Sequence, residues 1–71
     1  MNLKMEIFAE RLKELRTEKG LSQRELAKAV GLTQGAITHW ENGVRSPSGE
    51  ALILLAKYFG VTSDYLLGLE D

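Results

Sequence analysis

The side chains that metal sites and enzymes use most often are scarce in this sequence. His39 is the only histidine, and there is no cysteine. A transition-metal site needs several such ligands in a cluster. A histidine that activates a nucleophile needs that nucleophile and an orienting carboxylate, and His39 has neither at a recognisable spacing. We therefore expect no metal, no cofactor and no catalytic residue.

Polar side chains of another kind gather between residues 33 and 45. The carboxamide of Gln34 can bond to both hydrogen-bonding groups of an adenine edge, and Thr38 offers a hydroxyl and a methyl group to a base. Arg45 is a cation suited to a phosphate or to the minor groove. These residue types favour contact with a nucleic acid, although each could also be an ordinary solvated side chain.

Three short junctions divide the chain into helices. The sequence glycine, apolar residue, hydroxyl residue occurs at 20–22, 31–33 and 60–62. Glycine suits the left-handed position after a helix, and the hydroxyl residue suits the N-cap of the next one. The apolar residue between them can pack on the fourth residue after the cap. Ser22 and Glu25 also have the spacing of a capping box.

These junctions and the apolar spacing predict one all-α domain over residues 1–71. Five helices are expected, at about residues 5–19, 23–30, 34–41, 49–59 and 63–67. No segment alternates strictly enough to form a strand.

The second and third predicted helices are joined by a turn of about three residues, which predicts a helix-turn-helix over about residues 22–41. With Ile37 and Trp40 turned inward, the outward face of the third helix carries Gly35, Thr38, His39 and Asn42, with Gln34 at its edge. In a helix-turn-helix, the first residues of this helix contact base edges in the major groove.

The same segments carry a family resemblance. LSQRELA at 21–27, TQ at 33–34, WENG at 40–43, PS at 47–48 and VTSDYLLG at 61–68 together resemble the Cro and phage-repressor (Xre-type) regulators. The resemblance covers about residues 8–68. It implies a compact five-helix domain like that of lambda repressor, which binds double-stranded DNA.

The resemblance also implies contacts with DNA. The base-contacting residues would be Gln34, Gly35, Thr38 and His39. The phosphate-contacting residues would be Gln23, Thr33, Asn42, Gly43 and Arg45. Asn42 and Gly43 follow the third helix, and we expect their backbone N–H groups to meet the next phosphate. Gln23 matches the family's phosphate-binding glutamine at the start of a helix, where free N–H groups and the helix dipole suit an anion. Gly35 departs from the pattern: either the backbone lies very close to DNA there, or the position contacts no base.

An ion pair between Arg16 and Glu41 is a further implication of the resemblance, and it would fix the third helix against the first. The alternative is two independent surface charges. Arg11, Arg24 and Lys28 are expected to be solvated.

Useful affinity from a helix-turn-helix normally needs two copies on neighbouring half-sites, so we expect a homodimer at least on DNA. A self-complementary apolar patch is predicted from Leu54, Tyr58, Leu66, Leu67 and Leu69. The alternative is that Leu66 completes the core and the others are scattered surface residues.

Charge is distributed unevenly over the 71 residues, whose net charge is −1. Residues 1–46 carry eight Lys or Arg against six Asp or Glu, whereas residues 47–71 carry one against four. A positive face is therefore expected only in the first part. No apolar run approaches the roughly 20 residues of a membrane span, and no secretory signal begins the chain. We expect a cytoplasmic, nucleoid-associated protein without a membrane or small-molecule partner.

The predicted function is a sequence-specific, non-enzymatic transcriptional regulator, in first place a repressor that binds an inverted-repeat operator as a dimer. One alternative is the DNA-binding part of a larger regulator. The other is a protein-interaction module that has lost DNA binding. The low net charge and Gly35 favour the module, whereas Gln23, Gln34 and Arg45 favour DNA.

Overall fold

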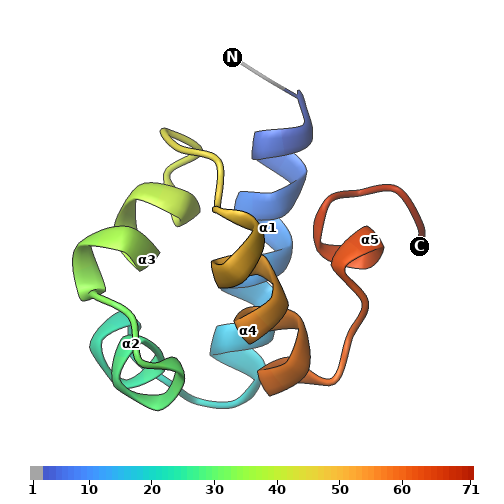
Figure 1. Ribbon diagram of the computed structural model, residues 1–71. Helices are drawn as coiled ribbons and strands as arrows, with labels where there is room; N and C mark the ends of the chain where they lie inside the picture. Colours follow the sequence, from blue (N-terminus) through green and yellow to red (C-terminus); the bar gives the residue numbers. More distant parts are fainter. Residues whose placement is uncertain (1–2) are drawn as a thin grey trace.

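The computed structural model describes residues 3–71, and every regular element among them is a helix (Figure 1). The helices are α1 (Leu3–Glu18), α2 (Gln23–Val30), α3 (Gln34–Glu41), α4 (Gly49–Phe59) and α5 (Ser63–Leu66). The predicted all-α class is confirmed, and three of the predicted helix bounds differ from the observed ones. Both α1 and α5 end one residue earlier than predicted, and α1 begins two residues earlier.

The helix junctions have the local structure that the sequence predicts. A hydroxyl side chain accepts a hydrogen bond from the backbone N–H three residues later at the start of four helices, from Ser22, Thr33, Ser48 and Thr62. Gly31 and Gly60 have φ angles of 73° and 69°, in the left-handed region that suits glycine. Each junction thus satisfies backbone groups at both helix ends and turns the chain sharply.

The capping box at the start of α2 is complete. The Glu25 N–H donates to Ser22 Oγ at 3.0 Å, and the Ser22 N–H donates to the Glu25 carboxylate at 2.8 Å. Hydrogen bonding to the backbone of Ser22 lowers the pKa of Glu25 below its ordinary value, and hydrogen bonding to the Ser22 side chain adds to this effect. These contacts define the first turn of α2, which lies next to α3.

One apolar core joins all five helices. Its fully buried side chains are Phe8, Leu12, Leu26, Ile37, Leu55 and Leu66. Trp40 is 6% exposed, and its ring lies edge-on to that of Phe8 with 6.3 Å between centroids. In Figure 1, α2 and α3 lie on one side of α1 and α5 lies on the other. Because α3 buries Ile37 and Trp40 in the shared core, its opposite face is fixed relative to the other helices.

Leu66 is wrongly placed in the predicted dimer patch. Its side chain has no exposed surface, because α5 packs against α1 and α4 and directs Leu66 between them. The alternative prediction, that Leu66 completes the core of the monomer, is the correct one.

Arg11 is not the freely solvated charge that the sequence predicts. Its guanidinium donates to the carbonyl oxygens of Tyr65 and of Glu70, the latter at 2.6 Å, and lies 4.2 Å from the centre of the Tyr65 ring. Arg11 therefore holds the C-terminal segment against α1. This segment, with its acidic residues, lies on the side of the molecule away from α3 (Figure 1).

No helix within residues 3–71 has the length and apolar character needed to cross a membrane.

Candidate nucleic-acid interface

The outward face of α3 is open to solvent. Gln34, Gly35, His39 and the following Asn42 are exposed, and Thr38 is half-buried. Ile37 and Trp40, on the opposite side, are buried. The structure thus brings the four predicted base-contacting residues to one side of a single helix, with Thr38 set deepest.

The first turn of α3 offers hydrogen-bond donors. Thr33 Oγ1 accepts from the Ala36 N–H at 3.2 Å, and Thr33 is exposed. The N–H groups of Gln34 and Gly35 belong to the first turn and have no acceptor within the helix. Together with the positive end of the helix dipole, they form an environment suited to an anion or to an electronegative base edge.

Gly35 is not required by the fold. A Cβ atom added at this position would meet no atom within 4 Å, and its φ angle lies outside the left-handed region. Glycine within a helix costs about 1 kcal/mol relative to alanine. No close packing at this position within the protein offsets the cost of the glycine.

A two-point ion pair joins α1 to the end of α3. Arg16 Nε donates to Glu41 Oε2 at 2.6 Å, and Arg16 Nη2 donates to Glu41 Oε1 at 2.9 Å. The side chains are only 12% and 3% exposed, respectively. The hydrogen bond to Glu41 raises the pKa of Arg16, despite the opposing effect of burial. A third bond, from Nη1 to the carbonyl oxygen of Leu21 at 2.7 Å, completes the environment of the guanidinium.

Gln23 belongs to the same network, which the sequence does not reveal. Its Nε2 donates to Glu41 Oε1 at 3.1 Å, and its Oε1 accepts from the Thr38 hydroxyl at 2.7 Å. Gln23 is therefore held in one orientation, with one amide N–H remaining for a phosphate. Gln23 and Thr38 lie on different helices, so no periodicity within one helix could have paired them.

The segment after α3 offers fewer backbone donors than predicted. The Asn42 N–H donates to the Thr38 carbonyl and the Gly43 N–H to that of Trp40, each at 3.1 Å. Both backbone N–H groups thus already have acceptors at the end of the helix, and contact of Asn42 and Gly43 with a phosphate stays a prediction. The side chains of Asn42 and Arg45 in this segment are exposed to solvent.

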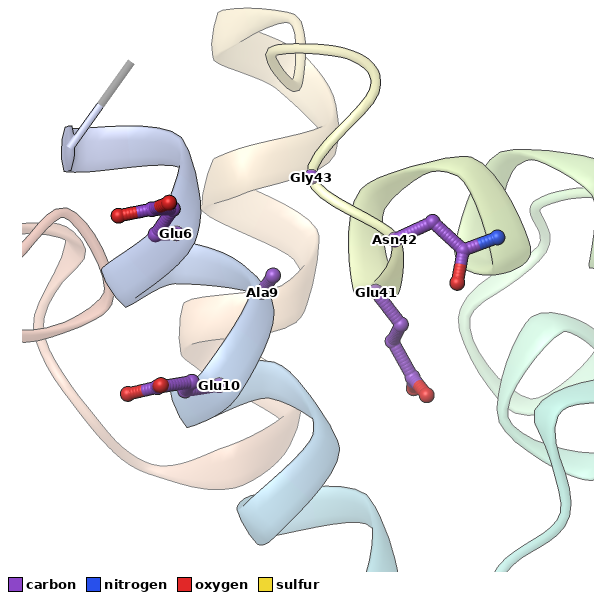
Figure 2. A pocket seen from close by; sticks show the side chains of 6 residues that line it. All are labelled: Glu6, Ala9, Glu10, Glu41, Asn42 and Gly43. Atoms are coloured by element: carbon purple, nitrogen blue, oxygen red, sulfur yellow. The ribbon is translucent and has the colours of Figure 1, made fainter. Parts of the chain in front are cut away.

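A shallow pocket of about 320 Å³ lies between α1 and the end of α3. Figure 2 shows its lining residues, Glu6, Ala9, Glu10, Glu41, Asn42 and Gly43. The carboxylates of Glu6 and Glu10 point away from Glu41, whose own carboxylate is held by Arg16. In the described part of the chain, no three His, Cys, Asp or Glu residues are grouped to hold a metal ion. The three carboxylates that line the pocket therefore do not converge on one point.

Apolar side chains are exposed on and near α4. Leu54 is 36% exposed and Leu69 is 58% exposed. Tyr58 and Leu67 are half-buried, and the Tyr58 ring packs edge-on against Phe59 with 5.1 Å between centroids. Ile53, which is 51% exposed, is a further exposed apolar residue of α4 and lies outside the predicted patch.

Known proteins are similar to this chain in sequence and in fold. The Helix-turn-helix family profile matches residues 12–66. Over 64 residues, or 90% of the chain, the sequence is 42% identical to the HTH-type transcriptional activator BcrR of Enterococcus faecalis. It is 36% identical over 62 residues, or 87% of the chain, to repressor protein C2 of Salmonella phage P22. The restriction-modification controller protein C.AhdI of Aeromonas hydrophila superposes with a TM-score of 0.82 and 35% identity, over 92% of this chain and 98% of that one.

The chain thus belongs to the helix-turn-helix family, of the Xre-like kind that includes phage repressors. The resemblance inferred from the motifs between residues 21 and 68 is confirmed. The chain spans only 31% of the length of BcrR and 29% of that of repressor protein C2.

Proposed function

We propose that this chain binds double-stranded DNA and regulates transcription, with α3 lying in the major groove. The observation that carries the proposal is the exposed face of α3, whose opposite face is held by the core and by the Arg16–Glu41 ion pair. Gln34, Gly35, Thr38 and His39 would lie against base edges, with Gln34 matched to adenine. The family of the chain and the acidic segment on the far side agree with this orientation.

Phosphate contacts would come from both ends of the helix-turn-helix. Gln23 retains an amide N–H at the start of α2, and Thr33 is exposed at the start of α3. The turn at Gly43 would present Asn42 and Arg45 to the next phosphate. With so few cations, we expect a shallow dependence of affinity on salt.

The finer proposal is a non-enzymatic repressor that binds an inverted repeat as a dimer and stays with the nucleoid. Phage repressor C2 supports repression, whereas BcrR is named an activator. All 71 residues would form a single binding domain. Because the chain spans less than a third of these two relatives, it would serve as the DNA-binding part of a larger regulator if further sequence is attached.

In-vitro selection from a random duplex pool tests the DNA proposal directly. We expect the purified protein to enrich an inverted repeat whose half-site centres lie about 34 Å, or one helical turn, apart. Absence of enrichment at low salt would contradict DNA binding and favour the protein-interaction module. Enrichment of a single half-site would support DNA binding and contradict the dimer.

The dimer patch is now limited to Leu54, Tyr58, Leu67 and Leu69. We expect Leu54→Glu to convert a dimer to a monomer in analytical ultracentrifugation, because a charge would be buried in an apolar interface. Ala29→Glu is the control, since Ala29 is exposed on α2 and the same charge is added there. Equal sedimentation of Leu54→Glu and the parent, at concentrations where the parent dimerises, would rule out this patch.

A substitution at Gly35 tests the requirements of folding and of DNA binding separately. We expect Gly35→Ala to raise the free energy of unfolding by about 0.5–1 kcal/mol, because the added methyl group meets no atom and alanine favours the helix. We also expect it to weaken binding to the selected duplex, because the helix backbone would lie against DNA. Gly49→Ala on α4, which likewise meets no atom, is the control and should not change DNA affinity. Unchanged affinity of Gly35→Ala would show that position 35 contacts no base.

A further inference from the structure

Four side chains from three helices form one continuous chain of hydrogen bonds beneath the exposed face of α3. Arg16 donates to Glu41, Gln23 also donates to Glu41, and Thr38 donates to Gln23. Every buried side-chain nitrogen or oxygen within the described residues has a partner. The chain ends at Thr38, the one member that lies on the predicted base-contacting face.

The charge of Arg16 sets the direction of every bond in this chain. A guanidinium has donors only, so both oxygens of the facing Glu41 carboxylate act as acceptors. The amide group of Gln23 must then turn its NH₂ toward Glu41, which leaves its carbonyl oxygen toward Thr38. A carbonyl oxygen cannot donate, so the bond of 2.7 Å is made by the hydroxyl proton of Thr38.

Thr38 therefore has no proton left for DNA. A threonine hydroxyl has one O–H donor and two acceptor lone pairs. With its proton committed to Gln23, it presents only lone pairs and the adjacent methyl group. In the free protein this arrangement already exists, so no rearrangement is needed before binding.

We infer that Thr38 is a specificity-determining residue that acts as an acceptor and an apolar contact, and so disfavours guanine at the base it meets. This inference rests on the proposed DNA-binding function. In the major groove, guanine presents the acceptors N7 and O6, which would face the lone pairs of Thr38. Adenine and cytosine present an amino group that Thr38 can accept from, and thymine presents a methyl group.

Two variants locate the base. In-vitro selection is run in parallel with the parent, with Thr38→Val, which keeps a methyl group but has no hydroxyl, and with Thr38→Ser, which keeps the hydroxyl. The position of the selected motif whose preference changes is the one that Thr38 contacts. We expect adenine, cytosine or thymine there on the contacted strand. A selected motif that no Thr38 variant alters would overturn the inference.

Single-group changes in the duplex then test the direction of the bond. For an adenine or cytosine contact, replacing the base by the analogue without its amino group should weaken binding of the parent about 3- to 10-fold. The same replacement should have little effect on Thr38→Val. For a thymine contact, uracil should weaken binding of the parent, with little effect on Thr38→Ser. For an adenine contact, 7-deazaadenine, which lacks only the N7 acceptor, should leave binding unchanged. A loss of binding with 7-deazaadenine that depends on Thr38 would show that the hydroxyl donates to DNA, and would overturn the inference.

Gln23→Met provides the reciprocal test, because it releases the Thr38 proton while filling a similar volume. We expect this variant to accept guanine at the Thr38 position, and continued rejection of guanine would contradict the role of Gln23.

Urea unfolding of Gln23→Met, Thr38→Val and the double variant tests the hydrogen-bond chain without DNA. Non-additive effects on stability support the chain, and additive effects contradict it. If the parent binds no duplex at all, the proposed function fails, whereas this unfolding cycle still decides the chain.

Discussion

Arg16→Met is expected to lower the free energy of unfolding by about 3–5 kcal/mol. The substitution leaves the carboxylate of Glu41, only 3% exposed, without its cation, and it removes the donor to the Leu21 carbonyl. At roughly 0.05–0.15 kcal/mol per residue, the total stability of a domain of 71 residues is about 4–11 kcal/mol, so the substitution removes a large fraction of it. Thermal unfolding followed by circular dichroism should show a decrease in Tm of more than about 12 °C.

Two further variants separate the ion pair from a general effect of charge. Arg24→Met removes an exposed arginine of α2 and should change stability by no more than about 0.5 kcal/mol. Arg16→Met combined with Glu41→Leu should recover much of the lost stability, because no charge is then left unpaired in the interior. An unchanged Tm for Arg16→Met would show that the pair contributes as little as two surface charges do.

Leu66→Ala is expected to destabilise the monomer by about 2–5 kcal/mol, the cost of removing a fully buried leucine and leaving a cavity. Within the described residues, Leu66 is the only fully buried large side chain of the short helix α5. In the Leu66→Ala variant, α5 should therefore separate from the core more readily than the other helices. Urea unfolding at a protein concentration low enough for the monomer to prevail measures the loss of stability. If Leu66 contributed only to a dimer patch, its truncation would leave the stability of that monomer unchanged.

Leu69→Ala is the matched control for Leu66→Ala. Leu69 lies three residues further along and is 58% exposed, so its truncation should change the stability of the monomer by about 0.5 kcal/mol or less. Equal losses for the two variants would contradict the distinction between the buried and the exposed leucine.

Local sequence was sufficient to predict the helices and their connections. Glycine is favoured after a helix by its lack of a Cβ, and a hydroxyl residue is favoured before one because it bonds to a free N–H. Both effects act within a few residues, so the junctions near Gly31 and Gly60 could be identified without knowing the fold. The outward face of α3 followed in the same way, because the apolar residues Ile37 and Trp40 determine which side of one helix is buried.

The network beneath that face was decided by the tertiary structure. Gln23 and Thr38 meet because α2 packs against α3, and no spacing within the sequence indicates which residues of two packed helices will meet. The same holds for Arg11, whose bonds to Tyr65 and Glu70 depend on how the last helix folds back on the first. Leu66 was ambiguous for a related reason, since a leucine can as well be buried in a monomer as in a dimer. The sequence determined which residues each helix turns inward and outward, whereas only the packing of the helices determined which polar groups meet and what they leave free for a partner.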